Sequence, residues 1–251
     1  MTTSVLGIDV DDELVARWRG WLMPERQPFV VPRALAAERG WADDRAGLAF
    51  EVVDTFEMYG AAGDEDIVLL DRAAARTLPA EVRHGQPSAH RWPVSDTAAD
   101  NARTLRYIER GRLASRHRDV TKAQWRDAAA LPGARTLAGT FPAGSGPNCF
   151  GTVMAAAGIA GAAEEWMQLQ PFECWLAASA RPGGRDEEPG TVLLWRDTDG
   201  APAHAAVTLG GGWALNKASQ GWMSPTQVLT VRQVVNRSRF RGLRLERRLL
   251  R

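Results

Sequence analysis

The stretch 143-AGSGPNCFGTVMAAAGIAG-161 decides the predicted fold, because within it a loop of glycine and proline becomes a helix at a cysteine. Gly146 and Pro147 interrupt any preceding helix, and Asn148 is a residue type that caps a first turn. Cys149 is then expected in that turn, where N–H groups and the helix dipole favour a thiolate. On these features alone, a buried inert cysteine is as well supported as a nucleophile.

A predicted hairpin later in the chain brings two more polar residues together. Residues 203–210 and 212–217 have strand character, and the glycines that join them predict a tight turn. If an odd-length loop is centred on Gly210, His204 lies directly opposite Asn216, with Cβ atoms about 5 Å apart. The two side chains are then within reach of a hydrogen bond.

The two faces of this hairpin differ in side-chain size. Alternation places Ala206 and Ala214 on the face of His204 and Asn216, and we expect the helix of Cys149 to pack there. A thiol, an imidazole and an amide would thereby converge as nucleophile, base and orienting group. A structural histidine and asparagine near a turn are the alternative.

Three segments carry a resemblance to a known family. NCFGTV (148–153), PGTVLLW (189–195) and HAAVTLGGGWALN (204–216) resemble, in order, the motifs of the NlpC-type papain-like cysteine peptidases and amidases. In that family a third polar residue follows the histidine by twelve positions, as Asn216 follows His204. The resemblance covers about residues 135–235, and it implies that Cys149 is the nucleophile, His204 the base and Asn216 the orienting residue.

The chain also departs from the family pattern around the nucleophile. Asn148 replaces the usual aspartate and Phe150 the usual serine, and the upstream tyrosine near the oxyanion site is missing. Thr140 and Ser145 are the polar substitutes in that loop. Together with Asn148 and Trp222 they are the candidates for the oxyanion site or the lining of the pocket. The nucleophile's own N–H is one expected oxyanion donor, whereas the second is unassigned.

The order of segments predicts an α+β protein with a papain-like core, in which the helix bearing the cysteine packs on a small antiparallel sheet. We expect a mixed α/β extension of unknown role over 1–130, the papain-like domain over 131–236, and a basic strand or tail over 237–251. The turn-rich segment 84–101 is the best candidate for a linker or long surface loop.

Composition limits the remaining possibilities. Two cysteines are too few for a disulfide scaffold, and the four histidines show no zinc spacing. We read Cys174 as a core residue within a helix, and His84, His90 and His117 as surface residues. No apolar run approaches the roughly 18 residues of a membrane helix. The N-terminus has no signal-like pattern, so we expect a cytoplasmic protein.

The C-terminal segment 237–251, RSRFRGLRLERRLLR, concentrates seven arginines beside one glutamate. It is expected to be a solvated strand with Phe240, Leu243 and Leu245 turned inward, and the alternative is a surface that binds anions.

These observations favour a cysteine hydrolase or acyltransferase that acts on a small-molecule or peptide amide through a thioester, with no metal or organic cofactor. An inactive papain-like scaffold that serves as a binding protein is the first alternative. The second alternative is a binder of nucleic acid or of an anionic surface through the arginine-rich tail. The favoured interpretation, the hydrolase or acyltransferase, involves no nucleic-acid partner and no membrane span. The sequence leaves the oligomeric state open.

Overall fold

The computed structural model describes residues 2–251, and these form two compact units of mixed α and β structure. The first unit comprises Val10–Arg110 with residues 2–3, and the second comprises Gly111–Arg251 with Ser4–Asp9. The segment 111–130, grouped above with the N-terminal region, lies in the second unit. Among the described residues, no helix is both long and apolar enough to cross a membrane.

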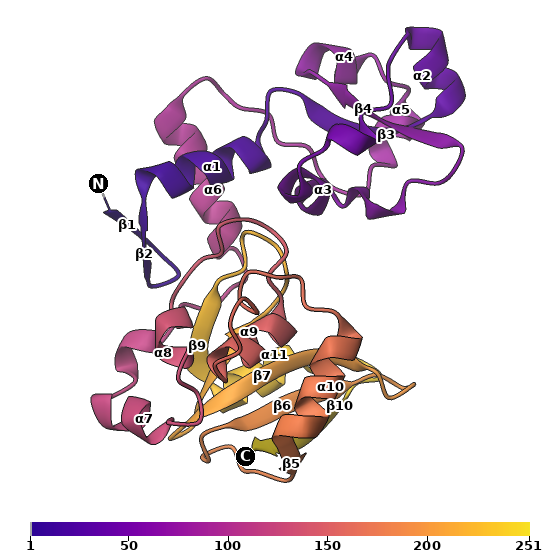
Figure 1. Ribbon diagram of the computed structural model, residues 1–251. Coiled ribbons are helices and arrows are strands. Elements are labelled where there is room, and N and C mark those ends of the chain that lie inside the picture. The colour runs from indigo at the N-terminus through magenta and orange to yellow at the C-terminus, as the bar shows by residue number, and fades with distance from the viewer. Residues whose placement is uncertain (1) are drawn as a thin grey trace. The chain divides into compact units, whose positions relative to one another are not determined.

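The first unit contains an antiparallel pair of strands, β3 and β4, with short helices around it (Figure 1). Asp71 caps the helix after β4 by accepting from the Ala74 N–H at 2.8 Å. A hairpin of β1 (Thr2–Val5) and β2 (Ile8–Asp11) precedes the first helix. The further elements are α1 (Asp12–Leu22), β3 (Gln27–Pro32), α2 (Arg33–Arg39), α3 (Phe50–Phe56), β4 (Glu65–Leu70), α4 (Arg72–Arg76), α5 (Ala80–His84) and α6 (Thr97–Glu109).

The segment between α5 and α6 has no helix or strand over residues 85–96, which agrees with the predicted long loop rather than with a free linker. Gln86 accepts from the Val30 N–H and donates to the Val30 carbonyl, both at 2.9 Å. Gln27 makes a similar pair of bonds with the backbone of Arg91. The segment therefore covers the edge of β3 that does not pair with β4. Its turn residues form part of the surface of the first unit.

The second unit is built on a six-stranded antiparallel sheet with the order β5-β10-β6-β7-β8-β9. The two strands expected at 203–210 and 212–217 are both present. The strands are β5 (Ala180–Pro182), β6 (Thr191–Arg196), β7 (Pro202–Gly210), β8 (Trp213–Lys217), β9 (Thr226–Thr230) and β10 (Arg244–Leu250). The helices are α7 (Lys122–Asp127), α8 (Ala134–Leu137), α9 (Cys149–Ala156), α10 (Leu169–Ser179) and α11 (Val231–Arg237).

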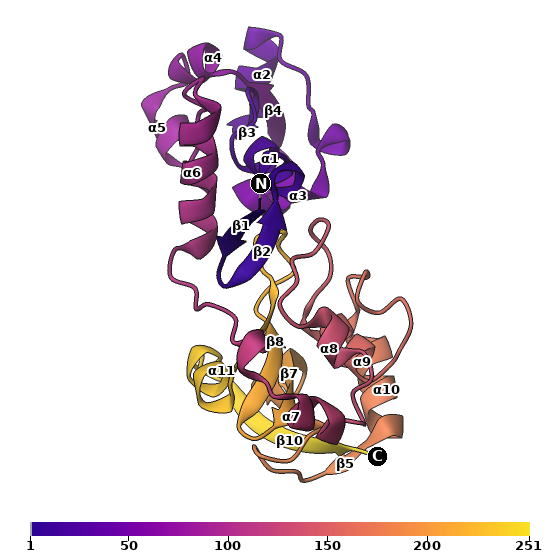
Figure 2. The same cartoon turned by 90° about the vertical axis from the view of Figure 1, so that its left-hand side faces the viewer.

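Two helical layers cover opposite faces of this sheet. Helix α9 packs with Val207 and Leu215, whereas α11 covers the face that carries Trp195 and Ala206 (Figure 2). The expectation that α9 packs on the small-sided face is therefore wrong. Large aliphatic side chains on the other face bury more apolar area against Phe150 and its neighbours, which favours the observed choice.

The arginine-rich C-terminus is a strand of the sheet. β10 lies between β5 and β6, and Leu243 and Leu245 pack against the buried cluster beneath α11. The expectation for Phe240 is wrong, because its side chain is 67% exposed. Arg247 forms an ion pair with Asp186 at 2.8 Å, so part of the positive charge is balanced within the unit.

Candidate active site

Cys149 is the first residue of α9, where the sequence places it. Asn148 is the N-cap, and its Oδ1 accepts from the Gly151 N–H at 3.0 Å. Its Nδ2 donates to the Met167 carbonyl at 2.8 Å, which ties the start of the helix to the segment before α10. Asn148 is thus a buried structural cap, and the N–H groups of Cys149 and Phe150 face the thiol instead.

The thiol of Cys149 lies in a dry environment and is 9% exposed. Burial raises its pKa from 9.0 to about 11, because desolvation disfavours the thiolate. The backbone N–H groups of Ala205, Phe150 and Cys149 and the charge of Lys217 act in the opposite direction, but they do not compensate for burial. The expected stabilisation of a thiolate at the helix start is therefore present, but the cost of burying the charged form outweighs it.

His204 and Asn216 form the hydrogen bond that the sequence predicts. The distance between His204 Nε2 and Asn216 Oδ1 is 2.9 Å. An amide oxygen can only accept, so Nε2 carries the proton and Nδ1 of the neutral ring is left as a base. Burial lowers the pKa of His204, which keeps the ring neutral at pH 7. The Trp195 ring, 5.3 Å away between centroids, packs beside it.

The strand register differs from the prediction by two residues. Val207 pairs with Leu215 and Thr208 with Ala214, so His204 and Asn216 are diagonal rather than opposite. A shift of two residues leaves every side chain on its original face, because side chains alternate with a period of two. Diagonal neighbours remain within reach of long side chains, so the hydrogen bond survives the error in register.

Cys149 and His204 approach strand β7 from its two faces. The thiol packs with the cluster under α9, whereas His204 lies on the face covered by α11. β7 pairs with β8 only from Val207 to Gly210, so this side of β7 is open at the level of Ala205. The thiol lies against the Ala205 N–H in that opening, one residue from His204. Within residues 2–251, no hydrogen bond joins Cys149 to His204.

Two cavities flank the site, one on each face of the sheet. The cavity on the α9 face has a volume of about 330 Å³, and Thr140, Ser145 and Lys217 are among its lining residues. The cavity on the α11 face has a volume of about 230 Å³ and is lined in part by His204 and Asn216.

Trp222 is fully buried, and its backbone N–H donates to Ser145 Oγ at 3.0 Å. It lines neither cavity, so it supports the loop of Ser145 rather than the pocket surface. Thr140 and Ser145 line the larger of the two cavities, and their loop forms much of its wall.

Lys217 is a charged residue at this site that the sequence analysis does not single out. Its side chain is 1% exposed, and its Nζ donates a short hydrogen bond to the Ser224 carbonyl. It follows Asn216 in β8, so alternation places it on the α9 face, near the thiol. A signal was available, since it is one of only two lysines in the chain.

The other reactive side chains differ from their predicted environments. Cys174 is exposed on α10 rather than part of the core. His90 and His117 are partly buried rather than surface residues, and burial lowers the pKa of each. His90 stacks on Phe29 with ring centroids 3.7 Å apart, and His117 accepts or donates a hydrogen bond with Ser115 at 3.0 Å.

Comparison of the chain with protein-family models, with curated proteins and with solved structures finds no match. The resemblance to NlpC-type enzymes therefore stays a prediction that rests on the three motifs and on the geometry described above.

Proposed function

We propose that the second unit is a cysteine-dependent amide hydrolase or acyltransferase with a papain-like core. The observation that supports this most directly is the 2.9 Å bond between His204 and Asn216, formed beside a cysteine at a helix start. The thiol of Cys149 lies against the N–H of Ala205, the residue that follows His204 in β7, and cysteine, histidine and asparagine perform acyl transfer together in other enzymes.

The resting state in this proposal is a neutral pair, not a thiolate and an imidazolium. The raised pKa of Cys149 and the lowered pKa of His204 both favour the uncharged forms at pH 7. Attack by sulfur on an amide or ester carbonyl therefore requires transfer of the thiol proton to His204 Nδ1 in the same step. Asn216 holds the imidazole in the tautomer that can accept it.

The remaining steps follow from that transfer. The carbonyl oxygen becomes an oxyanion that accepts from the Cys149 N–H at the start of α9. The imidazolium of His204 then gives its proton to the leaving amine or alcohol, and a thioester on Cys149 remains. His204 next removes a proton from water, or from another acceptor, as that group attacks the thioester.

In this proposal the acyl group extends from Cys149 toward the 330 Å³ cavity on the α9 face, which is lined by Pro147 and Thr152, close to Cys149 in the sequence, and not by Cys149 itself. Its wall combines hydroxyl groups from Thr140 and Ser145 with the buried ammonium of Lys217. These donors suit an acyl group that carries carbonyl or carboxylate oxygens, as a peptide does.

The test is formation of an acyl-enzyme from p-nitrophenyl acetate, followed by intact-mass and peptide mass spectrometry. The protein carries Cys174→Ser, which removes the exposed thiol without touching the site. We expect one acetyl group on Cys149 with a burst of p-nitrophenol, no burst after Cys149→Ala, and a much slower burst after His204→Ala. Acetylation of Cys149 at the same rate with and without His204 would contradict the proposal.

An inactive scaffold that binds a partner is the second candidate, and two observations favour it. Cys149 lines neither cavity, and its pKa lies far above neutrality. This alternative predicts no acyl-enzyme at Cys149. It also predicts that solvent-exposed groups are acetylated to the same extent in all variants. The same mass measurement therefore separates the two candidates.

A further inference from the structure

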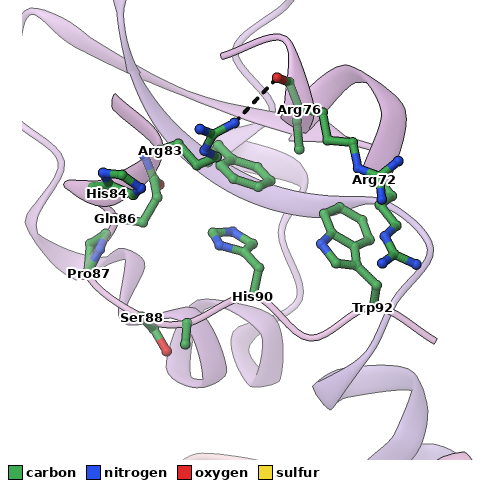
Figure 3. Close-up of a pocket in the computed structure, with 12 residues that line it drawn as sticks. Arg72, Arg76, Arg83, His84, Gln86, Pro87, Ser88, His90 and Trp92 are labelled. Atoms are coloured by element: carbon green, nitrogen blue, oxygen red, sulfur yellow. Dashed lines mark hydrogen bonds between the residues drawn. The ribbon is translucent and has the colours of Figure 1, made fainter. Parts of the chain in front are cut away.

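A pocket of the first unit lies between the short helices after β4 and the segment that follows them. It has a volume of about 590 Å³, within the range of about 300–1,000 Å³ typical of small-molecule sites. Arg72 and Arg76 come from the two ends of α4, and Arg83 and His84 from the end of α5 (Figure 3).

The charge of this pocket is opposite to that of the unit around it. Val10–Arg110 contains thirteen arginines against eighteen carboxylates, yet no aspartate or glutamate lines the pocket. Among the described residues, Arg72, Arg76 and Arg83 form no ion pair with a carboxylate. Within residues 2–251, the one hydrogen bond of these three guanidinium groups goes from Arg83 to the Arg76 carbonyl, at 3.4 Å. Guanidinium groups gathered without carboxylate partners are suited to an external anion.

The opposite wall of the pocket is aromatic and well anchored. Phe29 of β3 is buried, His90 stacks on it, and Trp92 lies nearly parallel with its ring centroid 6.4 Å from that of Phe29. His90 Nε2 donates to the Pro28 carbonyl at 2.8 Å, and Gln86 is bonded to Val30. The rings are thus held in place before any ligand binds, and flat apolar surfaces of this kind stack with planar groups.

We propose that this pocket binds a phosphorylated small molecule with a flat ring, of the nucleoside phosphate class. The guanidinium groups of Arg72, Arg76 and Arg83 bind the phosphate oxygens, and the ring lies against Trp92 and His90. Phosphate is preferred to a single carboxylate because three guanidinium groups match a group with several charged oxygens. The proposal depends only on residues of the first unit, so it stands whether or not Cys149 is a nucleophile.

The test is isothermal titration calorimetry of the full chain at physiological ionic strength, with ADP, pyrophosphate, adenosine and benzoate as probes. ADP is expected to bind saturably at one site, pyrophosphate about tenfold or more weakly because the ring contact is lost, and adenosine and benzoate more weakly still. The double variant Arg72→Gln/Arg76→Gln is expected to weaken ADP binding by about tenfold or more.

Arg17→Gln is the matched control, because Arg17 is exposed in the same unit and lies outside the pocket. It is expected to leave the affinity for ADP unchanged, and thermal melting of each variant checks that the fold is intact. No binding of ADP or pyrophosphate by the wild-type chain would overturn the proposal. Equal losses in Arg17→Gln and in the pocket variant would also overturn it, as would tighter binding of benzoate than of ADP.

Discussion

In the second unit the polar groups of the candidate site bind one another, whereas in the first unit those of the arginine pocket have few internal partners. His204 donates to Asn216, Asn148 caps α9, and Lys217 donates to a carbonyl. Arg72 and Arg76, in contrast, line a cavity whose lining residues include no carboxylate. A site that performs chemistry needs its groups held in place, and a site that binds an anion needs donors left for the ligand.

The largest expected effect concerns the ordered site. His204→Ala should lower kcat/KM for an activated ester by about 10²–10⁴-fold, because the thiol of Cys149 loses its base. Asn216→Ala should cost less, since the imidazole remains but its tautomer and orientation are no longer held. Steady-state kinetics at pH 7 check both, and Arg72→Gln should have no effect in the same assay. Equal kcat/KM for wild-type and His204→Ala protein would contradict the role of His204 as the base. It would also contradict the contrast drawn here between a catalytic site in the second unit and a binding site in the first.

The burial of the Cys149 thiol affects the free energy of unfolding at high pH. The unfolded chain loses the Cys149 proton near 9.0, whereas the folded chain keeps it to about 11. Between these values the folded state binds more protons, so the free energy of unfolding falls as pH rises. The loss reaches about 3 kcal/mol above the higher pKa.

Urea unfolding of wild-type and Cys149→Ala protein, at a pH below 9.0 and at a pH near 11, measures this effect. The variant lacks the titrating thiol and should lose less stability over the same interval. An identical pH dependence in both proteins would show that the thiol is not buried as described.

Close packing around α9 provides the next comparison. A Cβ placed on Gly151 would lie 2.2 Å from the Ala162 carbonyl oxygen, so Gly151→Ala must move backbone. We expect a loss of about 1–3 kcal/mol in the free energy of unfolding. Denaturant titration checks this value, and a variant as stable as wild type would contradict the packing of α9 described here.

The smallest effect is expected in the first unit. Gly20 lies in α1, and a Cβ there would meet no atom within 4 Å. Gly20→Ala should therefore stabilise the protein by about 0.5–1 kcal/mol, because alanine restricts the unfolded chain and favours the helix. Thermal melting of both variants checks this contrast. The Tm should rise for Gly20→Ala and fall for Gly151→Ala.

Local signals in the sequence predicted much of the second unit. Asn148 caps α9 because its side chain accepts from a nearby N–H group, which depends only on neighbouring residues. The strands around His204 and Asn216 were evident from composition and alternation. The two residues could be paired because any even shift in register leaves them on one face.

The errors arise where the outcome depends on distant contacts. Three consecutive glycines do not show which two form the turn; Gly211 and Gly212 do so, and Gly210 pairs with Trp213. The choice of face for α9 depends on the apolar area that the whole sheet offers.

The arginine pocket was missed for the same reason. Two of its aromatic rings, His90 and Trp92, lie in the segment 84–101, which has the composition of a linker and is held against β3 by hydrogen bonds between residues distant in sequence. The arginines at 72, 76 and 83 were visible in the sequence, but nothing local showed that they meet Phe29 and Trp92.

The most direct test of the central claim is the rate of Cys149 alkylation by iodoacetamide against pH, read by mass spectrometry with the exposed Cys174 as internal control. The account predicts two rises for wild-type protein. One occurs below 6.5, as His204 becomes neutral and can accept the thiol proton, and the other occurs toward 11, as the thiol itself ionises. The first rise should vanish in His204→Ala and the second should remain. A single rise toward 11 in both proteins would contradict the pairing of Cys149 with His204.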